Sequence, residues 1–203
     1  MEQVQACLSR LSSCIEGLIS RLQQAGSDKE LTSLGESTSV CLTSTQKGDK
    51  AEISRFCVSG EGTALASVDV EQESAYWEVE IVTTGKFKIG VAQRARPNEK
   101  KRLGGQLGED VRSWGLPSSR LELKEMDTIG VYYDQRTAPV LMFSLNGEMI
   151  EQTISGVKSD CRPAASVEKS TILKFRFDEH SFKYPPKGKL ARFSAIIPAR
   201  NVL

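Results

Sequence analysis

Apolar positions recur at alternating steps of four and three along the first 25 residues. This spacing is that of a coiled-coil seam, and it predicts an amphipathic helix over residues 1–25. A helix of this length is marginal alone in water, so we expect its apolar stripe to pair with a partner helix or a second copy of the chain. The seam residues, which form the expected helix interface, are Val4, Leu8, Leu11, Ile15, Leu18 and Leu22.

The pattern changes after a polar, aperiodic stretch at residues 26–39, which we interpret as a linker. From Val40 onward, short segments rich in β-branched and aromatic residues alternate with turns, and Asn146-Gly147 is a strong hairpin signal. No helical periodicity or strand–helix alternation follows, so the pattern predicts an antiparallel β-sandwich over residues 40–184. The expected strands are 40–44, 51–58, 64–70, 76–82, 87–92, 128–134, 140–147 and 171–177.

The last segment, residues 185–203, begins with two prolines and then becomes apolar. We interpret it as a C-terminal arm that either packs back on the sandwich or reaches a neighbour. The expected organisation is therefore an assembly helix, a linker, one sandwich domain and an arm.

The overall composition argues against several classes of partner. The chain has 27 Lys and Arg against 26 Asp and Glu, a net charge of +1, which gives no bulk attraction to nucleic acid or a membrane surface. No apolar run approaches the ~20 residues of a membrane span, and no secretory signal is expected because the N-terminus lacks a continuous apolar stretch. The five cysteines form no C-x-x-C pair, which disfavours a disulfide framework or a zinc site. We expect a cytoplasmic protein.

Residues that could carry catalysis are few. His180 is the only histidine, and no serine or cysteine nucleophile lies in a recognisable turn, so a catalytic role is disfavoured. The glycine-rich stretches 60–64 and 103–110 lack the features of a phosphate loop and favour turns. The acidic residues lack the spacing of a calcium loop. We therefore expect no catalytic residue, no metal and no cofactor.

Two carboxylates, Glu78 and Glu80, share one face of the strand expected at 76–82. Paired carboxylates in a groove are typical of enzymes that cleave sugars, so a carbohydrate-binding or carbohydrate-active β-sandwich is one alternative. The same alternation describes an ordinary strand with a solvated face, which we favour, with Trp77 pointing inward. For Trp114 we favour a place in the core over a binding surface.

The segment RARPNEKKR, residues 94–102, contains five basic residues and one acid. It fits either a docking loop for an acidic partner or a phosphate, or an ordinary solvated loop, and the sequence leaves both open. It has no aromatic residues, on which single-stranded nucleic acid would need to stack.

Six longer segments stand in a fixed order: YWEVEI (76–81), KIGVA (88–92), LGEDVRSWGL (107–116), DTIGVYYDQ (127–135), FSLNGEMI (143–150) and RPAASVEKSTILKFRF (162–177). This set resembles the SPRY domain, over residues from about 40 to about 184. The resemblance implies a mainly β fold, a bent antiparallel β-sandwich of the concanavalin-like jelly-roll type, here with an N-terminal amphipathic helix in addition. It also implies a non-catalytic protein that binds other proteins through loops at one end of the sandwich.

By position, the loops that the resemblance implies are 57–63, 94–110 and 167–171. In peptide-binding members of the family the last turn carries an aromatic residue, whereas here it carries Glu168, Lys169 and Ser170, which suit a polar or charged partner. The expected partner-binding residues are Arg55, Glu61, Arg94, Arg96, Lys100, Arg102, Glu168 and Lys169.

These observations favour a protein-interaction module, an adaptor or scaffold whose partners are proteins rather than nucleic acid. A structural subunit of a large cytoskeletal or ciliary assembly is a second alternative, in which the loops are passive and the helix and arm make the contacts. Both readings allow a homo-oligomer or a subunit of a larger complex.

Overall fold

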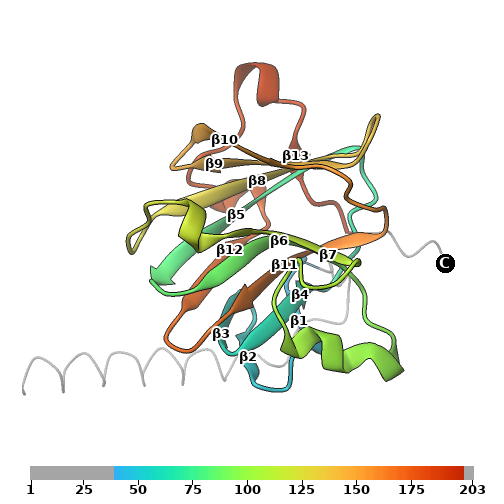
Figure 1. Cartoon of the computed structure of the whole chain (residues 1–203). Coiled ribbons are helices and arrows are strands. Elements are labelled where there is room, and N and C mark those ends of the chain that lie inside the picture. The colour runs from blue at the N-terminus through green and yellow to red at the C-terminus, as the bar shows by residue number, and fades with distance from the viewer. Residues whose placement is uncertain (1–38, 199–203) are drawn as a thin grey trace, which may run out of the picture. The chain divides into compact units, whose positions relative to one another are not determined.

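The computed structural model describes residues 39–198, which form a sandwich of two β-sheets (Figure 1). Strands that are neighbours along either sheet pair antiparallel, as the sequence predicted. The expected helix 1–25 with its interface residues, the linker up to residue 38, and residues 199–203 of the arm lie outside the described residues.

The two sheets differ in size. The five-stranded sheet has the order β1 (Leu42–Lys47), β4 (Gly62–Ala66), β11 (Cys161–Val167), β6 (Phe87–Gln93) and β7 (Ser113–Pro117). The eight-stranded sheet has the order β10 (Glu148–Ile154), β9 (Val140–Leu145), β8 (Thr128–Asp134), β5 (Ser74–Thr83), β12 (Ile172–Arg176), β3 (Cys57–Gly60) and β2 (Ala51–Ser54). Its last member, β13 (Ser194–Ala195), pairs parallel with β5.

Turn residues set the strand boundaries. The expected Asn146-Gly147 hairpin is confirmed: both residues have positive φ angles, 50° and 87°, and they join β9 to β10. The single strand expected at 51–58 is wrong, because the chain reverses at Arg55, whose φ is 44°, and forms the β2–β3 hairpin instead. No proline or glycine marks that reversal in the sequence.

The main core lies between the two sheets. Trp77 is fully buried in it, together with Val79 and Ile81 from the same strand, which confirms that Trp77 points inward. Trp114 is partly buried and packs against the same core. Aromatic and β-branched side chains on the inner faces of both sheets therefore hold the sandwich together.

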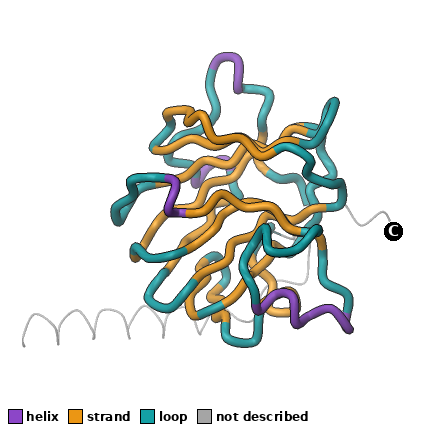
Figure 2. The backbone as a smooth tube through the Cα atoms, viewed as in Figure 1, coloured by secondary structure: helices purple, strands orange, loops and turns teal. Residues whose placement is uncertain are grey.

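The helical segments are short and lie outside the sheets (Figure 2). They are η1 (Pro97–Gly104), η2 (Ser118–Arg120), η3 (Glu179–Ser181) and η4 (Gly188–Leu190), all of the 3-10 type. The longest, η1, falls where the sequence predicted a loop. None of the helices within residues 39–198 is long and apolar enough to cross a membrane.

A second, smaller core explains why the segment around η1 is ordered. Leu103 and Leu107 are 1 % exposed and pack on Leu65, Ala92 and Ala164 of the five-stranded sheet. This segment thus covers part of the outer face of that sheet. Lys100, Lys101 and Arg102 are consequently carried on a helix with apolar anchors, whereas Arg94 and Arg96 precede that helix.

The C-terminal segment covers the outer face of the other sheet. Residues 178–198, which we call the C-terminal strap, place Phe182 on Tyr76 and Phe193 on Tyr132, with ring centroids 4.9 and 5.2 Å apart. Phe193 is only 3 % exposed. The described part of the arm therefore packs back on the sandwich, and β5 is buried on both faces.

Candidate functional site

The expected partner-binding residues lie at opposite ends of the five-stranded sheet. Strand β11 runs from one end to the other, and we name the ends after its residues Arg162 and Val167. At the Val167 end the three expected loops meet: the Thr63 hydroxyl donates to the Gly105 carbonyl oxygen at 2.7 Å, and the Gln106 side chain contacts Glu168. Glu61, Glu168 and Lys169 belong to this group.

Arg94, Arg96 and Lys100 lie toward the Arg162 end instead. Gln93, the last residue of β6, pairs with Cys161 at the start of β11, so the chain that follows it begins at this end. Arg55 is also on this side, because its carbonyl oxygen accepts the N–H of Leu42 at the start of β1. The structure therefore does not gather all the expected residues at one end.

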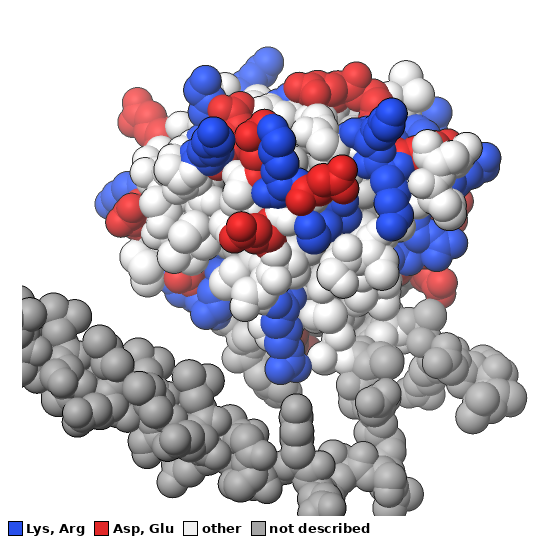
Figure 3. Space-filling model, turned by 90° about the horizontal axis from the view of Figure 1, so that it is seen from below, with Lys and Arg blue, Asp and Glu red and all other residues white. Residues whose placement is uncertain are grey.

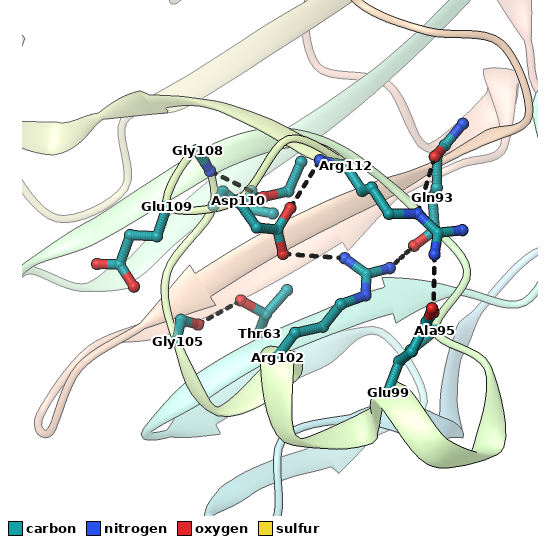
Figure 4. A network of polar contacts seen from close by, with 12 residues as sticks. Thr63, Gln93, Ala95, Glu99, Arg102, Gly105, Gly108, Glu109, Asp110 and Arg112 are labelled. Atoms are coloured by element: carbon teal, nitrogen blue, oxygen red, sulfur yellow. Dashed lines mark hydrogen bonds and ion pairs between the residues drawn. The ribbon is translucent and has the colours of Figure 1, made fainter.

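Arg102 has a structural role that the sequence did not reveal. Its side chain is 14 % exposed and its guanidinium lies between the Asp110 carboxylate, at 3.2 Å, and the carbonyl oxygen of Gln93 (Figure 4). Burial raises the pKa of Asp110, but the Arg112 backbone N–H, the Ser113 hydroxyl and Arg102 outweigh it, so the net pKa is lowered. These contacts secure Arg102 within its own loop, and its expected role in binding a partner stays a prediction.

A second arginine closes the same loop. Arg112 pairs with Glu99 at 2.7 Å, and Glu99 also accepts the backbone N–H of Arg96 at the start of η1. Figure 4 shows Arg102 and Arg112 side by side between the loop and η1. These two pairs fix the position of η1.

A hollow of ≈ 560 Å³ lies between η1 and the outer face of the five-stranded sheet. Four basic side chains line it: Arg94, Arg96, Lys100 and Arg162. Gln46 and the hydroxyl-bearing residues Thr43, Thr45 and Ser67 complete the polar lining. Among the described residues its lining contains no Asp or Glu, and we call it the basic hollow.

Buried contacts hold the entrance of the basic hollow in place. The side-chain amide of Gln46 on β1 exchanges two hydrogen bonds with the backbone of Ala95, at 2.7 and 3.1 Å. Both residues are buried. Because Ala95 is fixed in this way, the exposed arginines on either side of it, Arg94 and Arg96, are held at the rim.

The four cations differ in their partners. Arg162 is 9 % exposed at its side chain and is paired by Asp69 at 2.7 Å, while a further N–H donates to the Ala66 carbonyl oxygen at 3.3 Å. Arg94, Arg96 and Lys100 form no salt bridge with any residue in the range 39–198. The hollow therefore combines one arginine that is fixed by a salt bridge with three cations that form no salt bridge within residues 39–198.

A smaller hollow of ≈ 360 Å³ adjoins the first, and the two share Arg94 and Arg96. Its lining adds Arg112 and two carboxylates, Asp69 and Asp160. The charged residues that line the basic hollow are thus all basic, whereas both acidic and basic residues line the smaller hollow.

The prediction that Glu78 and Glu80 lie on a solvated face is wrong. Glu78 is fully buried and Glu80 is 6 % exposed, because the C-terminal strap covers this face of β5. Burial raises the pKa of Glu80, yet hydrogen bonds and charge from Lys183 and Arg176 outweigh it and leave the pKa lowered. Glu78 accepts the Tyr76 hydroxyl and two backbone N–H groups of the strap. Since these partners occupy both carboxylates, they are not available as an acid–base pair for sugar chemistry.

The remaining surface offers little further chemistry. Within residues 39–198 no group of three His, Cys, Asp or Glu is placed to hold a metal ion. His180 is exposed in η3, where its backbone N–H donates to Asp178 at 2.8 Å. On the face shown in Figure 3, basic and acidic side chains are interspersed. The basic hollow is thus a local feature in a balanced surface.

Comparison with known proteins agrees with this architecture. A family model described as SPRY domain matches residues 74–180. SPRY domain-containing protein 7 from Gallus gallus is 32 % identical over 151 residues, which cover 66 % of this chain and 71 % of the relative. The Bos taurus protein of that name is also 32 % identical, and the Homo sapiens protein 31 %, with the same coverage. The matched SPRY segment includes η1 and Arg162, whereas β1 and Ser67 precede it.

Proposed function

The chain belongs to the SPRY domain family, and on this premise we propose that it is a non-catalytic module that captures a negatively charged segment of a protein partner in the basic hollow. SPRY domains are generally protein–protein interaction modules. The observation that carries the proposal is the convergence of Arg94, Arg96 and Lys100, unpaired within residues 39–198, on a hollow that has no acidic lining residue in that range.

Energetics support a charged ligand. Cations that share a concave surface repel one another, and an anion placed among them relieves that repulsion and gains charge-assisted hydrogen bonds. The partner is a protein rather than nucleic acid because the hollow has no aromatic side chain in its described lining for bases to stack on.

The expected helix over residues 1–25 would supply a second contact, with a partner helix or with another copy of the chain. Two contact surfaces on one chain fit an adaptor: the hollow selects the partner and the helix fixes the assembly. This part of the proposal depends on the heptad pattern of the sequence.

Peptide binding to the full chain tests the hollow. The probes are fluorescein-labelled pools of short peptides with random flanks and a central anionic block, made either of Asp and Glu or of phosphoserine. A matching pool carries Lys and Arg. We expect fluorescence anisotropy to report binding of an anionic pool alone, and we expect binding to weaken as salt rises from about 0.05 to about 0.5 M.

Matched variants locate the contact. The double change Arg96→Glu and Lys100→Glu should abolish capture, whereas Lys86→Glu with Arg120→Glu should preserve it. Both pairs reverse one exposed arginine and one exposed lysine, but the second pair lies near the Val167 end, where the Lys86 carbonyl oxygen accepts the Glu168 N–H. Loss of capture in the second pair alone would move the site to the Val167 end and refute the proposal.

A further inference from the structure

We propose that the anion recognised in the basic hollow is a single phosphorylated side chain, phosphoserine or phosphothreonine, of the partner. This inference rests on the proposed function, because it specifies the ligand of the same hollow. It is carried by the number and kind of donors, by the fixed arginine, and by the mixed charge of the adjoining hollow.

The charge of the basic hollow matches a phosphate better than one carboxylate. Asp69 neutralises Arg162, and the three other cations remain unpaired within residues 39–198. A phosphorylated side chain carries about −1.5 to −2 charges at neutral pH and three strong acceptor oxygens, whereas a carboxylate carries one charge and two oxygens. A single dianion can therefore engage several of these cations at once.

The hydroxyl groups are set up as donors. The Ser67 oxygen accepts the Cys41 backbone N–H at 3.3 Å, so its own proton is free to point into the hollow. Thr43 and Thr45 share one hydrogen bond at 2.9 Å, which uses one of their two protons and leaves the other. A phosphate has three acceptor oxygens and a carboxylate has two, so a phosphate can accept more of these hydroxyl donors in addition to the guanidinium groups.

Arg162 supplies a guanidinium group whose position is fixed before the ligand binds. Its guanidinium is held by Asp69 and by the Ala66 carbonyl oxygen, and 9 % of its side chain remains exposed. A planar guanidinium fixed in this manner loses little side-chain entropy when it binds a phosphate oxygen. Exposed lysines alone would lack this advantage.

The adjoining hollow disfavours a run of acidic residues. A polyacidic segment that fills the basic hollow would place its next carboxylates beside Asp160 and Asp69, across the shared Arg94 and Arg96. Carboxylates that lie side by side repel one another, which would weaken binding of such a segment. One phosphate keeps its whole charge in the basic hollow and leaves the neighbouring position for a neutral or basic residue.

Affinity and pH dependence of peptide binding to the full chain test this inference. The probes are a phosphoserine pool, a pool with Glu-Glu in place of phosphoserine, and an unphosphorylated serine pool. We expect the phosphoserine pool to bind about tenfold more tightly than the Glu-Glu pool. Between about pH 5 and about pH 7.5 its binding should strengthen as the phosphate, with a second pKa near 6, loses its last proton, while binding of the Glu-Glu pool should stay constant.

No protein group at the hollow obscures this titration. The charged residues in its lining are Arg94, Arg96, Lys100 and Arg162. Asp69 pairs with Arg162, Glu99 accepts the Arg96 backbone N–H, and the described lining includes no histidine. The change Ser67→Ala removes one hydroxyl donor. It should therefore weaken binding of the phosphoserine pool about threefold or more and leave binding of the Glu-Glu pool unchanged.

The outcomes separate the two proposals. Equal affinity for the phosphoserine and Glu-Glu pools, or an affinity for the former that does not change with pH, would overturn the phosphate inference and leave the proposed function standing. Failure of every anionic pool would overturn both. Binding to vesicles of phosphatidylserine and phosphatidylcholine in place of all peptides would also overturn both.

Discussion

The carboxylate of Glu78, fully buried in the middle of β5, accepts the backbone N–H of Tyr184 at 2.7 Å. The second oxygen of Glu78 accepts the Lys183 N–H at the same distance, and the Tyr184 carbonyl oxygen shares the proton of the Tyr76 hydroxyl with Glu78. A charge on a central strand thus holds the C-terminal strap, which is more than a hundred residues away in the sequence.

Removing that charge should loosen the strap. In Glu78→Gln an amide NH₂ replaces one acceptor oxygen and faces a backbone N–H, which leaves a buried donor unsatisfied at a cost of about 1–3 kcal/mol. We expect the melting temperature to fall by roughly 2–4 °C per kcal/mol. Thermal unfolding followed by circular dichroism measures it, with the exposed Glu71→Gln as control. Equal melting of the two variants would mean that Glu78 does not secure the strap.

The sandwich should fold without the first 39 residues but should be less stable without the part of the strap that follows residue 184. A 40–203 fragment is expected to unfold cooperatively, because strand β1 begins at Leu42. A 40–184 fragment lacks Phe193 and exposes the ring of Tyr132 beneath it. Losing one buried aromatic side chain removes about 1.5–3 kcal/mol of apolar burial.

The shorter fragment should therefore melt lower and should bind a dye for exposed apolar surface. Differential scanning calorimetry on both fragments measures the difference. If the 40–184 fragment melted at the same temperature as the 40–203 fragment, the domain would end at residue 184. The part of the strap after that residue would then add no stability. If 40–203 were itself unfolded, the boundary at residue 40 would be misplaced.

Acid should weaken a second attachment of the strap. Hydrogen bonds from the Arg136 side chain, the Arg136 backbone N–H and Arg192 of the strap lower the pKa of Asp134 from 3.8 to about 2. Burial raises this pKa, but the hydrogen bonds outweigh it. A lowered folded-state pKa gives stability that is present above pH 3.8 and is lost as pH falls through about 2. The gain is on the order of 1 kcal/mol, because Arg136 and Arg192 are partly exposed and solvent screens the pair.

The change Asp134→Asn isolates this contribution. The free energy of unfolding of the original chain should exceed that of the variant by a constant amount from about pH 5 to pH 7. The gap should close as pH falls from about 4 to about 2. Urea titrations at each pH measure it, and a gap that persisted to the lowest pH would contradict the assignment.

Two basic residues of η1, Lys100 and Arg102, should respond differently to substitution. Arg102→Ala leaves the Asp110 carboxylate, 3.2 Å from the lost guanidinium, without its partner and should cost about 2–3 kcal/mol. Lys100→Ala removes an exposed side chain and should change stability by about 0.5 kcal/mol or less. Chemical denaturation compares the two. Equal effects would contradict the structural role of Arg102.

The sequence predicted the sandwich well because strand signals are local. Alternation in YWEVEI placed Trp77 inward correctly, and Asn146-Gly147 marked its hairpin. The same alternation misplaced Glu78, because a strand pattern reveals which residues share a face but not which distant segment covers that face. The Arg55 reversal was missed for a related reason: no glycine or proline marked it.

The basic hollow could be predicted only in part. The run RARPNEKKR indicated a charged docking segment, and Arg94, Arg96 and Lys100 do line the hollow. Its other walls come from β1, from the end of β4 and from β11, so Arg162 and Ser67 join it only through the fold. Arg102 looks like its neighbours in sequence, and only its burial against Asp110 distinguishes it.

The N-terminal segment yields the last prediction. Its six seam residues repeat over three heptads, and a lone helix of this length would leave that apolar stripe in water. Each buried Leu or Ile would contribute about 1.5–3 kcal/mol to an association. Replacing both Leu11 and Leu18 with Asp should therefore abolish self-association or capture of a partner helix, while the sandwich keeps its melting temperature.

A matched control adds the same charges elsewhere on the expected helix. Ser13→Asp with Ser20→Asp changes positions on the side opposite the seam, and it should leave association intact. Size-exclusion chromatography with light scattering, and pull-down with the full chain, compare the two double variants. If the seam variant unfolded the whole chain, the helix would belong to the core of its own sandwich. If both variants behaved alike, the heptad pattern would have no role in assembly, and the hollow would be the only contact that the proposed function retains.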